Sequence, residues 1–334
     1  MRLAATGDVM LGRNAGAVLR RRPPEYVWGD TLHLLRQADA LIVNLECVIA
    51  GEESGSPWPR KVFHFKAPPQ AVAALQAAGV SAVTLANNHT LDFGPAALAE
   101  MLDLLAAAGL PAAGAGRTAE EARRVVSLTV RGLRLALVSW TDNEPGWEAG
   151  PEKPGVFYAP VDLEDPRATA LLQTVRAARA GHDVVVVAAH WGPNMVPEPL
   201  PAHPPFARAL ADAGADLVLG TSAHVVQGIE LYRPLGRPER VAVICYDLGD
   251  YVDDYAVDPV LRNDLSLLFL FDVNSAGVRR VELHPVLIDG WRCQVNRARG
   301  TEAEAVLETM TQRCRKLGTA LQRTAPLVAA VEAA

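Results

Sequence analysis

The chain has 334 residues, half of them apolar, which is enough for a large hydrophobic core. Its net charge of −6 gives no basic footprint of the kind that broad nucleic-acid binding requires, so no nucleic-acid partner is expected. The four cysteines form no C-x-x-C pair, which excludes zinc-knuckle and thioredoxin-like motifs and favours a reducing compartment.

No segment has the roughly 18 consecutive apolar residues that a membrane span requires. The chain enters a predicted strand at Arg2, without a basic region followed by an apolar region and a cleavage site. We therefore expect a cytoplasmic protein with no membrane span. The sequence leaves the oligomeric state open.

Predicted strands and helices alternate along much of the chain. The hydrophobic runs expected to be strands are 3–6, 40–43, 82–86, 183–189 and 216–220. The helices expected between them are 31–38, 69–78, 95–108, 118–124, 167–180 and 205–213. Residues 125–130 and 133–139, joined by Arg131-Gly132, predict a β-hairpin.

The C-terminal part of the chain has a different pattern. Only strands are expected at 225–232, 241–246, 265–272 and 278–286. Mixed α/β units followed by antiparallel strands predict two packed sheets with helices outside them. We expect one α/β domain over residues 1–290 and a helical extension over residues 291–334, in which 301–334 form a helix. The loop 141–165 is a candidate lid.

Short polar motifs follow the ends of five hydrophobic runs. They are Gly7-Asp8, Asn44-Leu45-Glu46, Asn87-Asn88-His89, His190-Trp191-Gly192 and Ser222-Ala223-His224. In open α/β sheets the carboxyl ends of strands border the ligand crevice. Carboxylates, an amide and imidazoles delivered to one edge form an oxygen- and nitrogen-rich site for a divalent cation.

Each motif also has a simpler explanation. Asp8 alone is better explained as a turn or helix-capping residue. Glu46 follows a buried strand, where an unpaired carboxylate is costly, so a cation partner is favoured. Asn87, Asn88 and His89 are either helix-capping turn residues or a functional group, and we favour the second because three adjacent polar residues there need partners.

The histidines divide in the same way. His190 and His224 each follow an apolar strand. Because the other polar motifs also follow such strands, we favour a metal-ligand role for both histidines over the role of core residues that bond only within the protein. Ser222 either binds a ligand or stabilises its turn. His203, in a proline-rich loop after His190, has even odds of lining the pocket. Aspartates 247, 250, 253, 254 and 258 are interpreted as a solvated acidic loop rather than a cation-binding mouth.

At these motifs the chain resembles the CapA family of capsule and poly-γ-glutamate biosynthesis proteins, which is related to the calcineurin-like metallophosphoesterases. The resemblance runs from Gly7 to about Asp254 and includes Gly114-Ala115-Gly116 and Gln227-Gly228-Ile229-Glu230. It implies a metallophosphoesterase-like four-layer α/β/β/α sandwich. It also implies that one or two divalent ions are surrounded by Asp8, Glu46, Asn88, His190 and His224.

The resemblance gives His89 the substrate-facing position of a general acid, and we expect Asp92 to orient it. The residues expected to contact the substrate are Asn87, Asn143, Trp191, His203 and Ser222. Met10, Thr221 and Ser222 stand where related chains have histidines. The site is therefore richer in oxygen, which suits Mn, Mg or Ca better than Zn.

Two hypotheses remain open at this stage. The first is a hydrolase that uses metal-activated water on a phosphoester or a γ-glutamyl amide of a small or polyanionic substrate. The second is a non-catalytic protein that uses the same site to bind a cation-bridged polyanion. A structural protein without metal is a third and weaker interpretation.

Overall fold

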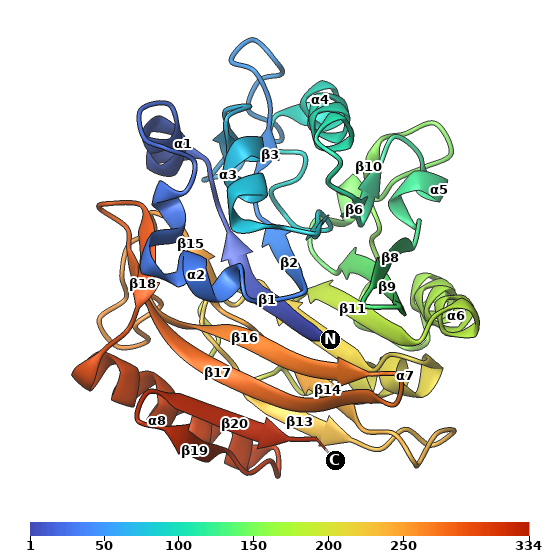
Figure 1. The fold of residues 1–334 in the computed structure, drawn as a ribbon. Helices are drawn as coiled ribbons and strands as arrows, with labels where there is room; N and C mark the ends of the chain where they lie inside the picture. The colour runs from blue at the N-terminus through green and yellow to red at the C-terminus, as the bar shows by residue number, and fades with distance from the viewer. Residues whose placement is uncertain (334) are drawn as a thin grey trace.

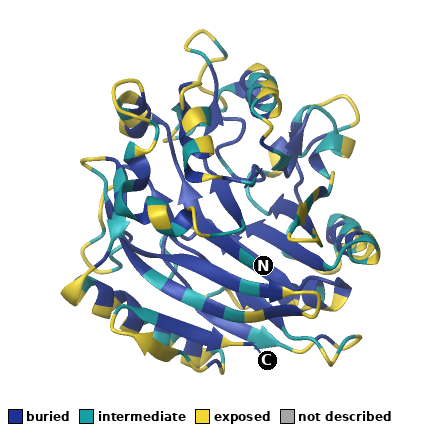
Figure 2. Cartoon of the chain, in the orientation of Figure 1, coloured by how far each residue is buried: buried dark blue, intermediate teal, exposed yellow. Residues whose placement is uncertain are grey.

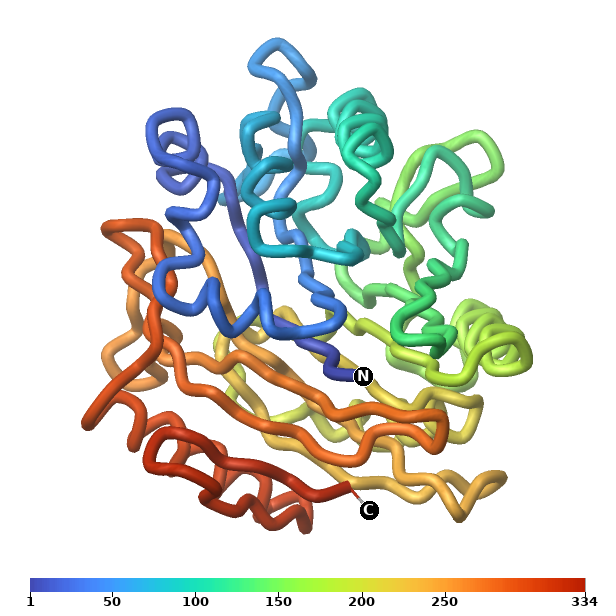
Figure 3. Tube along the Cα trace, in the orientation of Figure 1, coloured from blue at the N-terminus to red at the C-terminus, as the bar shows by residue number. Residues whose placement is uncertain are grey.

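The structure is a computed structural model that describes residues 1–333. Two large β-sheets pack face to face, and helices cover the outer face of each sheet (Figure 1). This arrangement is the predicted four-layer α/β/β/α sandwich. In Figure 3 the first residues of the chain, in blue, lie against strands from the orange C-terminal third.

The first sheet has ten strands. Its main path runs through β19 (Gln322–Ala325), β20 (Val328–Glu332), β17 (Gly277–Asp289), β16 (Leu265–Asn274), β1 (Arg2–Val9), β2 (Ala40–Leu45), β5 (Ala82–Thr84) and β6 (Ala112–Ala113). Two shorter strands join it, β15 (Asp250–Val252) beside β1 and β18 (Gln294–Arg297) beside β17. Strand β1 pairs in parallel with β2 and β15 and antiparallel with β16.

The second sheet has six strands. They lie in the order β13 (Ile229–Tyr232), β14 (Ala242–Cys245), β12 (Leu217–Thr221), β11 (Val184–His190), β9 (Leu133–Thr141) and β8 (Val126–Val130). Strands β8 and β9 form the predicted hairpin. Strands β9, β11, β12 and β14 are parallel neighbours, so their carboxyl ends share one edge.

Alternation of side chains explains the layers, because successive residues of a strand point to opposite faces. In β2, Ile42 faces the second sheet, whereas Leu41 and Val43 face the helices. In β11, Val186 faces the first sheet and Val185 faces the other helical layer. The central strands β2 and β11 are covered on both faces and buried throughout, whereas outer strands such as β17 and β8 alternate buried and more exposed residues (Figure 2).

Apart from α1, which was not predicted, the main helices occur close to their predicted positions. Helices α1 (Arg13–Leu19), α3 (Ala71–Ala78) and α4 (Gly94–Ala107) pack on the first sheet, and α6 (Pro166–Gly181) and α7 (His203–Ala213) pack on the second. The shorter elements are η1 (Tyr26–Thr31), α2 (Leu32–Leu35), α5 (Ala119–Ala122), η2 (Pro145–Trp147), β3 (Val48–Ile49), β4 (Lys66–Ala67), β7 (Ala115–Gly116) and β10 (Gly155–Val156). Gly79 ends α3 in the left-handed conformation, with φ of 78°. Within residues 1–333, no helix is both long and apolar enough to cross a membrane.

The C-terminal segment differs from the prediction of one helix. Helix α8 (Gly300–Lys316) is followed by the hairpin β19–β20, and β20 pairs with β17. Residues 329–331 of β20 are buried between β17 and the edge strand β19. As a strand, β20 pairs with backbone groups of β17 that a helix would leave unpaired. Only the first half of the predicted helix is therefore helical.

Candidate metal centre

Strand register brings polar side chains together at one edge of the first sheet. Asp8, at the end of β1, lies opposite Asn44 of β2 on one side and opposite Asp250 of β15 on the other. The Asn44 amide donates a hydrogen bond to Asp8 Oδ1 at 2.6 Å. In the second sheet His190 ends β11 between Thr141 and Thr221. The carboxyl ends of both sheets thus face each other across the candidate site.

Gly7 makes this arrangement possible. A Cβ atom at this position would lie 1.7 Å from the backbone oxygen of Gly249, which leaves no room for a side chain. Because the two backbones approach so closely, the Asp8 amide donates to the Gly249 oxygen at 2.9 Å. The glycine before Asp8 is therefore needed for the contact between β1 and the segment that carries Asp250.

Four buried residues form a compact group of possible metal ligands: Asp8, Glu46, His224 and Asp250. Each offers one ligand atom, and these atoms lie within 4.8 Å of one another. His224 Nδ1 lies 2.8 Å from Asp250 Oδ1 and 3.5 Å from Asp8 Oδ2. His224 has a φ of 59°, a left-handed conformation that is unusual for a histidine and turns it into the group.

Glu46 Oε1 lies at the centre of the surrounding imidazoles. The Nε2 atoms of His190 and His224 each lie 3.9 Å from it, and that of His89 lies 4.0 Å away. Among residues 1–333 this fully buried oxygen has no hydrogen-bond partner. The other carboxylate oxygen, Oε2, accepts a hydrogen bond from the Tyr255 hydroxyl at 2.9 Å.

The distances of 3.9–4.0 Å between Glu46 Oε1 and the imidazole nitrogens fit ligands of a shared cation better than they fit hydrogen bonds. They exceed hydrogen-bond lengths, but ligands held at about 2.0–2.2 Å from one ion lie roughly 3–4 Å from one another. A buried carboxylate oxygen without a donor is costly unless a cation neutralises it. The donor set, mostly carboxylate oxygen with imidazole, is one that Mn²⁺ or Mg²⁺ accepts.

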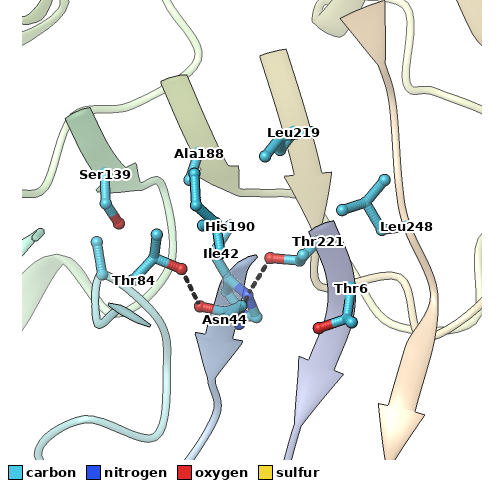
Figure 4. Close-up of a pocket in the computed structure, with 11 residues that line it drawn as sticks. Thr6, Ile42, Asn44, Thr84, Ser139, Ala188, His190, Leu219, Thr221 and Leu248 are labelled. Atoms are coloured by element: carbon cyan, nitrogen blue, oxygen red, sulfur yellow. Dashed lines mark hydrogen bonds between the residues drawn. The ribbon is translucent and has the colours of Figure 1, made fainter. Parts of the chain in front are cut away.

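His190 is held by neutral groups on both sides of its ring. Its Nε2 lies 3.1 Å from Asn88 Oδ1, and its Nδ1 lies 2.9 Å from Thr221 Oγ1. Figure 4 shows Thr221 and Asn44 reaching toward His190 beside a small cavity between the sheets. Thr84 donates to Asn44 Oδ1 at 2.9 Å, so a buried polar chain links the two sheets below the site.

His89 lies against Asp92, the residue expected to orient it. Its Nδ1 lies 2.6 Å from Asp92 Oδ2, and its ring stacks on Phe65 with the centroids 3.9 Å apart. Lys61 Nζ lies 2.6 Å from the other oxygen of Asp92 and also donates to the backbone oxygen of Asn88. The contact with Asp92 therefore leaves His89 Nε2 facing Glu46.

The buried ionisable groups of this site shift one another's pKa values. Burial raises the pKa of Glu46 well above its ordinary value, and the charge of Asp8 raises it further. Burial also raises the pKa values of Asp8 and Asp250, against the opposing charge of His224. Although burial opposes protonation of His224, its carboxylate neighbours raise its pKa well above the usual range. The imidazolium of His224 is thus the cation nearest to these carboxylates in the metal-free protein.

The other two imidazoles have the opposite tendency. Burial, followed by the charge of Lys61, lowers the pKa of His89 well below its ordinary value. Burial, followed by the charge of His224, does the same for the pKa of His190. Both rings are therefore neutral in the metal-free protein near pH 7.

The structure places three of the predicted substrate residues next to the group. Asn143 lies within 3.4 Å of Ser222 Oγ, and the Ser222 amide donates to Asp8 Oδ2 at 3.3 Å. Asn87 is fully buried and uses its side chain to shape the turn, donating to the Leu45 oxygen and accepting from the His89 amide. Its partners are thus all within the protein.

Trp191 and His203 do not reach this group, and their expected place in the pocket is corrected. Trp191 follows His190, so the alternation of the strand turns its side chain toward α6 and α7. Its indole donates to the Tyr246 backbone oxygen at 3.0 Å and stacks on His203 with the centroids 4.5 Å apart. Both are buried core residues.

The interpretation of the acidic segment as a solvated loop is also wrong for most of its members. Four of the five aspartates of this segment are buried: Asp247, Asp250, Asp253 and Asp254. Asp250 was missed although Gly249-Asp250 repeats the Gly7-Asp8 pattern after a hydrophobic strand. Lys61 and Tyr255 were missed as well, and no local pattern in the sequence distinguishes them. Thr221 was noted only as a residue that stands where related chains have histidine.

Comparison with known proteins shows the family to which the chain belongs. Residues 2–255 match the sequence model of the family described as "Bacterial capsule synthesis protein PGA_cap". The chain belongs to this family. The matched PGA_cap region contains all four residues of the compact group, Asp8, Glu46, His224 and Asp250.

Several relatives match this chain over most of its length. A "Probable polyglutamine synthesis accessory protein" of Mycobacterium tuberculosis is 32% identical over 94% of this chain and 83% of its own length. The "Capsule biosynthesis protein CapA" of Bacillus anthracis is 29% identical over 86% of this chain and 67% of its own length. Among solved structures, a hypothetical protein from Thermus thermophilus aligns with a TM-score of 0.50 and 17% identity, over 85% of this chain and 98% of that one. That likeness concerns the fold alone.

Proposed function

We propose that this chain is a divalent-metal-dependent hydrolase of capsule or poly-γ-glutamate metabolism. The observation that carries the proposal is the unpaired, buried Glu46 Oε1, which three imidazole Nε2 atoms surround at 3.9–4.0 Å. The place in capsule metabolism rests on the family and on the names of the relatives.

One or two divalent ions would be held within a single set of residues. These are Asp8, Glu46, Asn88, His190 and His224, with Asp250 added from the geometry. Such an ion, when bound, activates water as a nucleophile and neutralises charge that develops on the substrate oxygen. Because carboxylate and amide oxygens outnumber imidazoles, Mn, Mg or Ca suits the set better than Zn.

The chain's own residues supply the proton transfer. Asp92 and Lys61 fix the His89 ring through Nδ1, and Nε2 faces the ligand group. In this position Nε2 would take up a proton from solvent once the anionic substrate is bound, and would deliver it to the leaving group as the bond to it breaks. The turn that carries Asn88 and His89 is held by Asn87, so its geometry is set before the substrate binds.

The substrate is proposed to be anionic and either a phosphoester or a γ-glutamyl amide. Both bonds develop negative charge on an oxygen in the transition state, which cations near Glu46 would stabilise. Asn143 and Ser222 lie beside the group and offer an amide and a hydroxyl to such a substrate.

Turnover with added metal tests this proposal. The purified protein, stripped with a chelator and reloaded with Mn²⁺, Mg²⁺, Ca²⁺ or Zn²⁺, would be tested on p-nitrophenyl phosphate, a phosphodiester and a γ-glutamyl peptide. We expect metal-dependent hydrolysis of at least one substrate. His89→Ala should abolish it while retaining the ion, and His33→Ala, at an exposed histidine of α2, is the matched control.

The two hypotheses predict different outcomes of this experiment. A protein that retains the ion but turns over none of the three substrates would contradict the hydrolase. Binding of polyglutamate that depends on the ion, without cleavage, would then support the polyanion-binding alternative. Equal activity of His89→Ala and wild type would contradict the role of His89.

A further inference from the structure

Arg13 follows the end of β1 and is linked to the candidate metal centre by a short series of ring contacts. Its guanidinium carbon lies 5.7 Å from the centroid of the Phe65 ring. Phe65 stacks on His89 with the centroids 3.9 Å apart and on Tyr255 with the centroids 5.5 Å apart. The Tyr255 hydroxyl donates to Glu46 Oε2. Arg13 therefore lies at the rim of the site, beside the rings that line it.

The guanidinium of Arg13 is held in place at one end. Its Nε lies 3.3 Å from Asp254 Oδ1, and the Asp254 side chain is buried. The Phe63 ring supports it as well, with the guanidinium carbon 6.0 Å from the centroid. Within residues 1–333 the two terminal nitrogens donate no hydrogen bond, and the side chain is 38% exposed. A guanidinium fixed in this way keeps its terminal donors for a ligand.

The backbone holds Arg13 in an unusual conformation. Its φ is 50°, in the left-handed region that residues other than glycine seldom adopt. A Cβ atom at Gly12 would lie 3.1 Å from the Lys66 backbone nitrogen, so the turn before Arg13 packs closely on β4. Neutralising Asp254 requires a positive charge, but it does not require a strained backbone or free terminal donors. Strain of this kind is typical of functional positions.

The charges around the site leave a place for this cation. The carboxylates of Asp8, Glu46 and Asp250 repel an anionic substrate as it approaches. Lys61, the other cation beside His89, already binds Asp92 and the backbone oxygen of Asn88. Arg13 is the neighbouring cation whose donors remain available.

We propose that Arg13 is a specificity-determining residue that binds a second anionic group of the substrate, a carboxylate or a phosphate, away from the bond that is cleaved. This inference rests on the proposed function and narrows the substrate to a molecule with at least two anionic groups separated by several atoms. The guanidinium fork fits either anion in a bidentate contact. Because the contact is remote from the reacting bond, it lowers KM more than it raises kcat.

Titration with anions of increasing length tests this proposal. The Mn²⁺-loaded protein, carrying His89→Ala to prevent turnover, would be titrated with γ-glutamyl oligopeptides and with linear oligophosphates, and inorganic phosphate is the reference with one anionic group. We expect affinity to rise with length in one of the two series, which identifies the second group as carboxylate or phosphate. No rise in either series would overturn the proposal.

Arg13→Gln should weaken binding of the longer anions alone. We expect a loss of about tenfold, the effect of one charge-assisted contact, with the affinities for Mn²⁺ and inorganic phosphate unchanged. Arg13→Lys keeps the charge beside Asp254 but lacks the planar fork, so it should restore the stability and little of the affinity. If Arg13→Gln lowers stability but binds the longer anions as tightly as its parent, Arg13 serves Asp254 alone and the proposal is wrong.

Arg22→Gln is the matched control. Arg22 is also an exposed arginine beside an aromatic ring, with its guanidinium carbon 5.3 Å from the Tyr26 centroid, but it contacts none of the rings beside the site. This variant should bind every anion as its parent does. An equal loss of affinity in Arg13→Gln and Arg22→Gln would indicate a general charge effect and contradict a specific contact.

Chemical modification of the natural chain covers the case in which the Arg13 variants fail to fold. Phenylglyoxal modifies accessible guanidinium groups, and peptide mass spectrometry reports each arginine separately. The longest anion that binds should slow modification of Arg13 and leave that of Arg22 unchanged. Equal modification of Arg13 with and without the anion would overturn the inference and leave the proposed hydrolase standing. A protein that binds neither Mn²⁺ nor phosphate would contradict the proposed function, and this inference with it.

Discussion

Asp8 and Asp250 lie opposite each other on the parallel strands β1 and β15, and His224 lies between their carboxylates, 3.5 Å from Asp8 Oδ2 and 2.8 Å from Asp250 Oδ1. Because β1 and β15 are parallel neighbours, their ends bring two carboxylates close to one imidazole. Burying both carboxylates is unfavourable in the metal-free protein, which makes a cation at this position stabilising. The following predictions depend on this convergence.

Metal removal should lower the stability of the protein. An ion that binds the folded state alone, at about 100 times its dissociation constant, adds about 2.7 kcal/mol to the free energy of unfolding. We therefore expect chelation to lower the melting temperature and Mn²⁺ to restore it. Calorimetric scans with and without Mn²⁺ measure the melting temperature. Identical melting temperatures would contradict selective binding of the ion to the folded protein.

Gly7→Ala should disrupt both the fold and the site. The new Cβ would lie 1.7 Å from the Gly249 oxygen, so the backbones of β1 and the segment before β15 would have to separate. We expect a loss of about 3 kcal/mol of folding free energy, typical of overpacking, and weaker Mn²⁺ binding. Urea denaturation measures the first effect.

Gly181→Ala is the matched control for this change. A Cβ at Gly181, the last residue of α6, meets no atom within 4 Å. This variant should be as stable as wild type or slightly more stable, because alanine favours the helix. Equal destabilisation by the two substitutions would contradict the role given to Gly7.

Loss of the general acid should depend on the leaving group. His89→Ala removes the group that protonates the leaving oxygen, and general acids contribute about 10²–10⁴-fold. An alkoxide needs this proton far more than p-nitrophenolate does. We expect a much larger loss of kcat on an alkyl phosphate than on p-nitrophenyl phosphate, with Asp92→Asn intermediate. Equal losses of kcat on both substrates would contradict the role of His89 as the general acid.

The stability of the metal-free protein should depend on pH with a defined sign. The pKa values of Glu46, Asp250 and His224 are raised in the folded state, and burial raises the pKa of Asp247 to about 7. The folded state thus binds more protons than the unfolded state between pH 8 and about 6.5. The free energy of unfolding should therefore rise as the pH falls through this window.

His89 and His190 oppose this trend only in the lower part of the window. Their pKa values are lowered in the folded state, so the unfolded state alone protonates them as the pH approaches its value of about 6.5. Mn²⁺ should weaken or reverse the dependence, because ions bind deprotonated ligands. Urea denaturation at pH 8 and pH 6.5, with a chelator or with Mn²⁺, measures both slopes. Stability that falls from pH 8 to 6.5 in the chelated protein would contradict the assigned shifts.

Thr221→Val should affect the site without changing its shape. The substitution is nearly isosteric and removes the hydroxyl that lies 2.9 Å from His190 Nδ1. Leaving a buried ring nitrogen without its partner costs about 1–3 kcal/mol. Thr221→Ser retains the hydroxyl and should recover most of this stability. Equal stability of Thr221→Val and wild type would show that the hydroxyl is not needed there.

Much of the fold and part of the site could be predicted from the sequence. Strand-end motifs are local, so the positions of Asp8, Glu46, His190 and His224 followed from hydrophobic runs and the parallel topology. Asp250 was not identified in this way. Its Gly249-Asp250 motif is a local signal, but its place beside Asp8 depends on β15 pairing with β1, more than two hundred residues away in the chain.

The errors have physical causes of the same kind. Trp191 is adjacent to His190 in sequence but points to the opposite face, because its direction follows the strand pleat rather than the motif. The alanine-rich C-terminal segment has a local preference for helix. It forms strand β20 instead, because it pairs with β17 of the first sheet. In both cases long-range packing overrides a local preference.

Crystals grown with Mn²⁺ and measured at the manganese absorption edge test the central claim most directly. The predicted result is an anomalous peak about 2.0–2.6 Å from ligand atoms of Asp8, Glu46, His224 and Asp250. Absence of any peak at this group in a crystal soaked with saturating Mn²⁺, with Glu46 Oε1 instead hydrogen-bonded to the protein, would contradict it.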